Sequence, residues 1–157
     1  MKKQKPRSKR RRDPALPTKR KVEKKWKDVD YYFCDNLLGE DSVLSATIES
    51  SDAAGLPPIA VAPNQGKLLQ LLAEMIPARS ILEIGTLGGY STICMARALP
   101  PDGHIITLEV DPRHAEVARK NFVRAGLGHK IEILVGSAVD TLPTLRDRHR
   151  GPFDLVF

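Results

Sequence analysis

The segment richest in chemical information is glycine-rich: Glu83-Ile84-Gly85-Thr86-Leu87-Gly88-Gly89-Tyr90-Ser91. Glycines where a strand turns into a helix let the backbone approach a ligand closely, at the carboxyl edge of a parallel sheet. A dinucleotide site would follow the pattern G-x-G-x-x-G and direct a helix N-terminus at a pyrophosphate. Here Leu87 stands where the second glycine of that pattern belongs, and Glu83 puts a carboxylate two residues before the first. Such a carboxylate repels a phosphate and attracts an ammonium or a sulfonium group.

Two further segments favour a nucleoside ligand. Glu109 follows the second expected strand, 20 residues after Gly89, and an acid at that place accepts hydrogen bonds from ribose hydroxyls. The small residues of Gly136-Ser137-Ala138, at the end of the third strand, leave room for a flat adenine ring. The three segments together favour S-adenosylmethionine as the cofactor. A nicotinamide-linked oxidoreductase remains a second hypothesis, which Glu83 and Leu87 disfavour.

The elements that position these segments alternate between strands and helices. Strands are expected at Ser80–Ile84, His104–Leu108, Ile131–Val135 and Phe153–Phe157, and helices at Ser91–Leu99, Asp111–Gly126 and Ala138–Leu145. Asp111 and Pro112 form a helix start, and Gly126 a helix end. This alternation predicts an α/β fold, a Rossmann-like parallel sheet with helices on both faces. Its first strand, with Ile81 and Ile84, is expected to be central and buried.

The chain before the first strand is expected to be helical. The pattern predicts helices at Asp28–Leu38, Asp41–Ala53 and Gln65–Ile76, the last capped by Asn64. The aromatic cluster that precedes them is expected to pack against the sheet, with a lid over a substrate entrance as the alternative. Its members are Trp26, Tyr31, Tyr32 and Phe33.

The net charge of +6 conceals an asymmetry. Residues 1–27 contain 14 Lys or Arg and two acids, whereas the remaining 130 residues contain 11 basic and 17 acidic side chains. Such a basic segment with few apolar residues is typical of disorder. The sequence therefore predicts a disordered tail, residues 1–25, and one domain, residues 26–157. Because clustered Lys and Arg bind phosphates, an RNA-binding module that uses the tail is the alternative function.

Other reactive side chains give little indication of a site. The four histidines lack metal-ligand spacing, and His114 is expected to face solvent. Cys34 and Cys94 are far apart in the sequence, which is typical of a reduced, cytoplasmic protein, and Cys94 is expected in the core. No apolar run is long enough to span a membrane.

From about Trp26 to Phe157 the sequence resembles the metal-dependent O-methyltransferases that include the caffeoyl-CoA and catechol O-methyltransferases. The most specific stretch is Ile81-Leu82-Glu83-Ile84-Gly85-Thr86-Leu87-Gly88-Gly89-Tyr90-Ser91-Thr92. Supporting segments are Gly55-Leu56-Pro57, Gln65-Gly66-Lys67-Leu68-Leu69, Thr107-Leu108-Glu109, His114-Ala115-Glu116-Val117-Ala118-Arg119 and Gly151-Pro152-Phe153-Asp154-Leu155-Val156-Phe157.

The resemblance implies a role for each matching residue at the cofactor. Val61 would flank the methionine end, and Glu83 and Ser91 would hold its amino and carboxylate groups. Gly85 and Thr86 would lend backbone contacts, Glu109 would accept the ribose hydroxyls, and Ala138 would border the adenine. The acceptor would be a hydroxyl of a small catechol-like or phenolic molecule, and a homodimer is a further candidate assembly.

The resemblance also implies a divalent cation, Mg²⁺, that orients the acceptor. In this family its ligands come from an acidic segment after the fourth strand and a later Asp-Asn pair. The sequence ends at Phe157, within that strand. We therefore expect the sheet to be incomplete at its C-terminus, the metal ligands to be absent, the catalytic residues to be unassigned, and this chain alone to lack methyltransferase activity.

Overall fold

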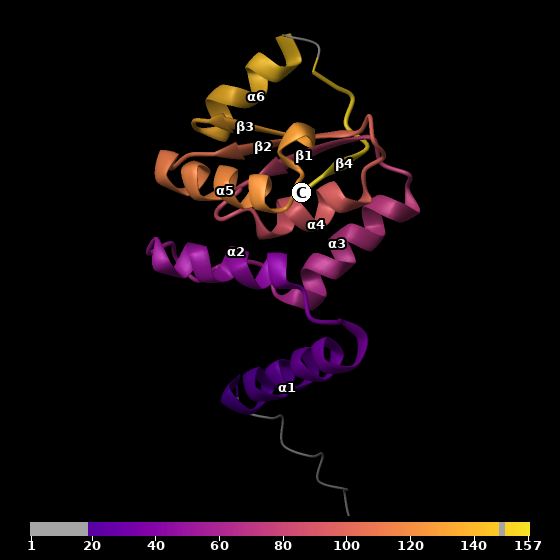
Figure 1. Ribbon diagram of the computed structural model, residues 1–157, viewed down its shortest axis with the longest axis vertical. Helices are drawn as coiled ribbons and strands as arrows, with labels where there is room; N and C mark the ends of the chain where they lie inside the picture. Colours follow the sequence, from indigo (N-terminus) through magenta and orange to yellow (C-terminus); the bar gives the residue numbers. More distant parts are fainter. Residues whose placement is uncertain (1–18, 148–149) are drawn as a thin grey trace, which may run out of the picture.

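The computed structural model describes residues 19–147 and 150–157, which form an α/β domain with a parallel sheet (Figure 1). Its helices are α1 (Lys19–Leu37), α2 (Ser42–Ala53), α3 (Pro63–Met75), α4 (Tyr90–Ala98), α5 (Pro112–Arg124) and α6 (Ala138–Asp147). Its strands are β1 (Ser80–Ile84), β2 (His104–Glu109), β3 (Ile131–Val135) and β4 (Leu155–Val156). The expected alternation of strands and helices after residue 80 is confirmed.

The sheet has the strand order β3-β2-β1-β4, and all its pairings are parallel. Leu82 of β1 pairs with Ile106 of β2 on one side and Val156 of β4 on the other. The carboxyl ends of β1, β2 and β3 therefore meet at one edge of the sheet. The segments that the sequence marked as ligand-binding follow these three ends.

Helices cover both faces of this sheet, with α4 and α5 on one face and α6 on the other (Figure 1). Because successive side chains of a strand point to opposite faces, Ile81 and Leu82 belong to different core clusters. The first cluster joins the sheet to α3 and α4 through Leu69, Ala73, Ala78, Ile81, Met95, Ala96, Leu99 and Ile105. The second joins it to α6 through Leu82, Ile106, Leu108 and Leu145. Full burial of an apolar side chain such as Ile81 stabilises the fold by about 1.5–3 kcal/mol.

The expectation of a central, buried first strand is half correct. β1 lies between β2 and β4, and Ile81 is fully buried, but Ile84 is 48% exposed. Ile84 points to the same face as Leu82, two residues nearer the end of the strand. Of the described elements, α6 alone covers that face (Figure 1), and it leaves Ile84 open to solvent.

The structure corrects two helix starts. The first helix begins at Lys19 rather than Asp28, so the expected domain start at Trp26 falls inside a continuous helix. Helix α3 begins at Pro63, with Ala62 rather than Asn64 as its N-cap residue. Proline favours the first position of a helix, and the Gln65 side chain accepts a hydrogen bond from the Ala62 N–H. Of the expected disordered tail, residues 1–25, residues 19–25 belong to α1 instead, and residues 1–18 lie outside the described residues.

The aromatic cluster does not pack against the sheet, which makes that expectation wrong. Trp26, Tyr31 and Tyr32 are each about two-thirds exposed, and Phe33 is 43% exposed. The reason is the position of α1, which projects beyond α2 and α3 on the side away from the sheet (Figure 1). No described helix is long and apolar enough to cross a membrane.

Candidate functional site

The candidate site lies at the carboxyl edge of the sheet, where three loops meet. Gly85 follows β1 and donates its N–H to the Leu108 carbonyl of β2, at 2.8 Å. Gly136 follows β3 and donates to the Glu109 carbonyl, also at 2.8 Å. These two hydrogen bonds continue the strand pairing past the ends of the strands. They bring residues 85–89, 109–111 and 136–138 together, as the sequence predicted.

Left-handed backbone shapes the loop after β1. Gly85 has φ +102°, and a β-carbon built on it would meet no other atom within 4 Å, so its backbone borders open space. Gly89 has φ +89°, and a β-carbon there would lie 2.4 Å from the ring of Phe122. Gly85 therefore leaves room for a ligand, and Gly89 lets α4 begin directly against α5.

Leu87 also adopts a left-handed conformation, with φ +49°. For a residue with a β-carbon this costs about 1–2 kcal/mol. The Leu87 N–H donates a hydrogen bond of 2.7 Å to Glu109 Oε2. The loop after β1 is thus held in its shape by the carboxylate at the end of β2.

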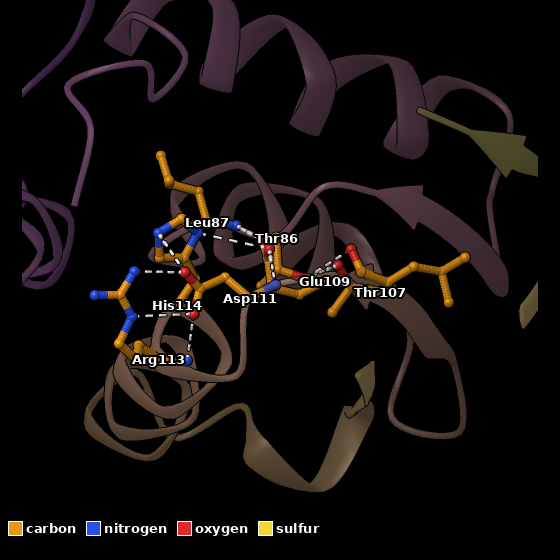
Figure 2. A network of polar contacts seen from close by, with 8 residues as sticks. Thr86, Leu87, Thr107, Glu109, Asp111, Arg113 and His114 are labelled. Carbon is orange, nitrogen blue, oxygen red and sulfur yellow. Dashed lines mark hydrogen bonds and ion pairs between the residues drawn. The ribbon is translucent and has the colours of Figure 1, made fainter. Parts of the chain in front are cut away.

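Glu109 is 6% exposed, and two backbone amides fix its carboxylate (Figure 2). Oε2 accepts from Leu87, and Oε1 accepts from the Asp111 N–H at 2.9 Å. A carboxylate oxygen accepts about two hydrogen bonds, so each oxygen retains capacity for a second donor. Glu109 is therefore an oriented acceptor for a pair of hydroxyl groups.

The expectation that His114 faces solvent is wrong. Its side chain is only 18% exposed. Its Nδ1 lies 3.5 Å from Glu109 Oε1, and its Nε2 lies 3.7 Å from Asp111 Oδ2 (Figure 2). Asp111 caps α5 by accepting the Arg113 N–H at 2.8 Å. Hydrogen bonds from the Arg113 guanidinium and N–H lower the pKa of Asp111 to about 2. The imidazole thus lies between two carboxylates beside the expected ribose position.

Glu83 is fully buried, and three hydroxyl groups donate to its carboxylate. Ser91 Oγ donates to Oε1 at 2.6 Å, and Thr92 and Thr107 donate to Oε2 at 2.5 and 2.6 Å. Burial raises the pKa of Glu83, while the three hydroxyls act in the opposite direction. Glu83 thereby ties together β1, β2 and the first turn of α4.

The proton that Ser91 donates determines what its oxygen can bind. A serine hydroxyl has one proton and two acceptor lone pairs, and here the proton points to Glu83. Ser91 is 7% exposed and lies in the first turn of α4, directly after the glycine segment. Toward a ligand, this oxygen acts as an acceptor.

The remaining predicted residues border the same region less directly. Thr86 is buried; its carbonyl accepts the Gly89 N–H, and its hydroxyl lies 2.5 Å from Thr107 Oγ1, which ties the loop to β2. Ala138 is half-buried at the start of α6. Val61 is half-buried in the loop between α2 and α3. A β-carbon on Gly88 would lie 3.7 Å from Leu56, which places the beginning of that loop beside the glycine segment.

Sequence reasoning missed Asn121, a fully buried residue of α5 that supports the glycine segment. Its Nδ2 donates to the Gly88 carbonyl at 2.8 Å. Its Oδ1 accepts from Ser50 Oγ at 2.8 Å and from Arg124 at 2.6 Å. Asparagine is a weak helix former. An asparagine near the end of an amphipathic helix therefore indicates a role in side-chain contacts, and this could have pointed to Asn121.

The site offers a ligand mainly acceptor groups and open space over backbone. Glu109 suits hydroxyl donors, and Ser91, in front of the Glu83 carboxylate, suits a cationic group. Among residues 19–147 and 150–157, no group of three or more His, Cys, Asp or Glu side chains could hold a metal ion. The described residues therefore fit a nucleoside with a cationic substituent and do not fit a divalent cation.

Comparisons with known proteins identify the family of the chain. The O-methyltransferase family model matches residues 37–157. A catechol O-methyltransferase of Niastella koreensis is 54% identical over 132 residues, which are 84% of this chain and 60% of that protein. A catechol O-methyltransferase of Mycobacterium tuberculosis is 56% identical over 130 residues, which are 83% of this chain and 58% of that protein. The chain thus spans about 60% of the length of these curated relatives.

A solved structure extends the similarity to the fold. The O-methyltransferase from Bacillus cereus in complex with SAH superposes with a TM-score of 0.83 and 46% identity. The match covers 85% of this chain and 61% of the Bacillus protein. The parallel sheet with helices on both faces is therefore that of a solved methyltransferase.

Proposed function

Because the chain belongs to the O-methyltransferase family, we propose that it forms the S-adenosylmethionine-binding part of an enzyme that methylates a hydroxyl group. The observation that carries this proposal is the Glu109 carboxylate, which two backbone amides orient at the edge of the sheet. The Bacillus relative, solved with SAH, supports the choice of cofactor.

The nucleoside half of the cofactor lies over the ends of β2 and β3 in this proposal. Glu109 accepts the two ribose hydroxyls with the lone pairs that Leu87 and Asp111 leave free. The backbone of Gly85 and Thr86 borders the ribose and the chain that joins it to sulfur. Ala138, a small residue at the start of α6, borders the adenine.

The methionine half lies near the N-terminus of α4, between the glycine segment and the loop that contains Val61. There the Ser91 oxygen accepts a hydrogen bond from the ammonium group, because its own proton is committed to Glu83. The Glu83 carboxylate lies behind Ser91, and its negative charge favours the ammonium without touching it. Glu83 is then a positioning residue that acts through Ser91.

When bound, S-adenosylmethionine supplies a methyl group on a cationic sulfur, which an acceptor oxygen attacks in line. The described residues contribute by holding the two ends of the cofactor, so that the methyl group is presented in one orientation. The names of the two curated relatives support a catechol-like or phenolic acceptor. The residues that bind and deprotonate this acceptor remain unassigned.

Four further expectations stay predictions. The first is that this chain alone lacks methyltransferase activity, which an assay with catechol, labelled cofactor and Mg²⁺ measures. A cytoplasmic location agrees with the two free cysteines, of which Cys94 lies in the core as expected. An RNA-binding role would use the basic tail, and no observation on the described residues supports it. Self-association as a homodimer is the fourth.

Calorimetry with SAH and with NAD⁺ tests the proposed cofactor. We expect SAH to bind the purified chain with one site per chain, and NAD⁺ to give no measurable heat of binding. The reason is that a pyrophosphate would lie at the glycine segment near the Glu83 carboxylate, whereas SAH puts an ammonium group there. Binding of NAD⁺ with equal or greater affinity would contradict the proposal.

A further inference from the structure

The His114 side chain of α5 lies between two carboxylates at the edge of the sheet (Figure 2). Its Nδ1 is 3.5 Å from Glu109 Oε1, and its Nε2 is 3.7 Å from Asp111 Oδ2. The side chain is 18% exposed, so the protein covers most of its surface. In the function proposed above this imidazole has no role, although it adjoins the carboxylate that would hold the ribose.

The two contacts determine which form of the imidazole fits this position. A neutral imidazole carries one N–H group, and its other nitrogen has a lone pair. In either tautomer this lone pair would face a carboxylate oxygen, and the two would repel each other. The protonated ring carries an N–H group on both nitrogens and places a positive charge between two negative groups. The geometry therefore suits the protonated form of His114.

The two carboxylates depend on this positive charge to different degrees. Asp111 has a second cationic partner, because Nη2 of Arg113 lies 2.8 Å from its Oδ2. Among the described residues, His114 is the one basic side chain within 4.0 Å of the Glu109 carboxylate. Apart from this contact, Glu109 has only its two backbone N–H donors. The charge of His114 thus acts chiefly on Glu109.

Other charged groups near the imidazole leave this balance unchanged. The glycine segment contributes an uncharged group, the N–H of Leu87. Farther along α5, Glu116 and Lys120 pair with each other at 3.3 Å. Glu83 of β1 lies close enough to Glu109 for the two carboxylates to repel each other, and this repulsion adds to the raised pKa of Glu83. None of these groups supplies Glu109 with a further cation.

We propose that His114 is a positioning residue, which in its protonated form holds the Glu109 carboxylate in the orientation that binds the ribose. This inference rests on the cofactor site proposed above. Loss of the proton leaves at most one of the two contacts, since a neutral ring donates only once. The carboxylate is then less well ordered before binding. Because histidine ordinarily changes its charge between about pH 5 and 8, cofactor binding should weaken as the pH rises through this range.

Calorimetric titration of the full chain with 5′-methylthioadenosine at several pH values tests this role. The probe has the adenine and ribose of the cofactor but lacks its ammonium group, so it reports the nucleoside half alone. We expect its Kd to rise about threefold to tenfold between about pH 5 and 8, an effect between those of an exposed and a buried ion pair. With SAH, loss of the Glu83 proton would act in the opposite direction, because the ionised carboxylate favours the ammonium group.

Three variants separate the charge of His114 from its bulk. His114→Gln keeps a neutral donor, so its Kd for the probe should stay at the high value of the wild-type chain at about pH 8. His114→Arg keeps a positive charge and should bind the probe more tightly than His114→Gln at this pH. His129→Gln is the matched control, since His129 is exposed in the short helix before β3, and it should follow the wild-type profile. Thermal unfolding of each variant checks that the domain stays folded.

Two results would overturn the role of His114 and leave the cofactor site intact. One is a wild-type Kd for the probe that does not change with pH. The other is a His114→Gln variant with the pH profile of the wild-type chain, even at lower thermal stability, because the imidazole would then be only structural. A wild-type chain that binds neither SAH nor the probe at any pH would instead contradict the proposed function, and this inference with it.

Discussion

Replacing Glu83 by alanine is expected to lower the free energy of unfolding by about 3–5 kcal/mol, the cost of removing one partner from a buried polar network. The three hydroxyls of Ser91, Thr92 and Thr107 would lose their acceptor inside the core. The deleted carboxylate would also leave a cavity, since Glu83 is fully buried. Chemical denaturation monitored by circular dichroism measures this loss.

The control for this prediction is Glu116→Ala, at a side chain of α5 that is 59% exposed and paired with Lys120. It should change the free energy of unfolding by less than about 1 kcal/mol, as a surface ion pair does. A loss at Glu83 no larger than the loss at Glu116 would contradict the central place of the Glu83 network in the fold.

The pH dependence of stability provides a second readout for Glu83. Burial raises the pKa of Glu83 above its ordinary value of 4.5. Between the ordinary pKa of the unfolded chain and the raised pKa of the folded protein, the folded protein binds more protons than the unfolded chain. The free energy of unfolding therefore falls as the pH rises through this range. Asp41, Asp111 and Asp154 have lowered pKa values, and their contribution has the opposite sign, at lower pH. Glu83→Gln should remove the decline of the free energy of unfolding above pH 4.5. It should leave unchanged the loss of stability at lower pH that the three aspartates cause.

Replacing Glu109 by alanine is expected to weaken cofactor binding about tenfold to a hundredfold, as the loss of hydrogen bonds to a charged acceptor does. In our proposal the variant loses both ribose contacts. It also loses the acceptor that holds Leu87 in its left-handed conformation and the N–H of Asp111 in place. The loop after β1 would then be less ordered before binding. Titration calorimetry with SAH gives the change in Kd.

Glu132→Ala is a suitable comparison, because Glu132 lies on β3, with its side chain 45% exposed and paired with Arg150. Its Kd for SAH should equal that of the wild-type chain. An unchanged Kd in a folded Glu109→Ala variant would remove Glu109 from the cofactor site.

The sequence predicted the strands and helices after residue 80 well, because buried parallel strands and capped helices have strong local signals. Asp111 and Pro112, for example, start α5 as expected. The neighbourhood of Gly85, Glu109 and Ala138 was also predictable, since parallel strands place their carboxyl ends together. The exposure of Ile84 was not, because it depends on how far α6 extends over the sheet rather than on the strand itself.

Other features depend on contacts between elements distant in sequence. Trp26, Phe33 and Leu37 of α1 have the spacing of a core helix, and only the structure shows that each of them is 43–69% exposed. Glu83 was interpreted as a carboxylate beside the ligand, whereas three hydroxyls from two other elements enclose it. The support that Asn121 gives to Gly88 joins residues 33 positions apart.

Titration of the ¹⁵N-labelled chain with SAH, followed by amide chemical shifts, tests the central claim most directly. If the cofactor lies at the carboxyl edge of the sheet, the largest changes should occur at Gly85, at Leu87 and Asp111, whose N–H groups hold Glu109, and at Ala138. Amides of α1 and of the outer face of α3 should change little. Changes concentrated around the cavity of about 860 Å³ that α1, α2, α3 and α4 line, with Gly85, Leu87 and Asp111 unaffected, would contradict the assignment of this site.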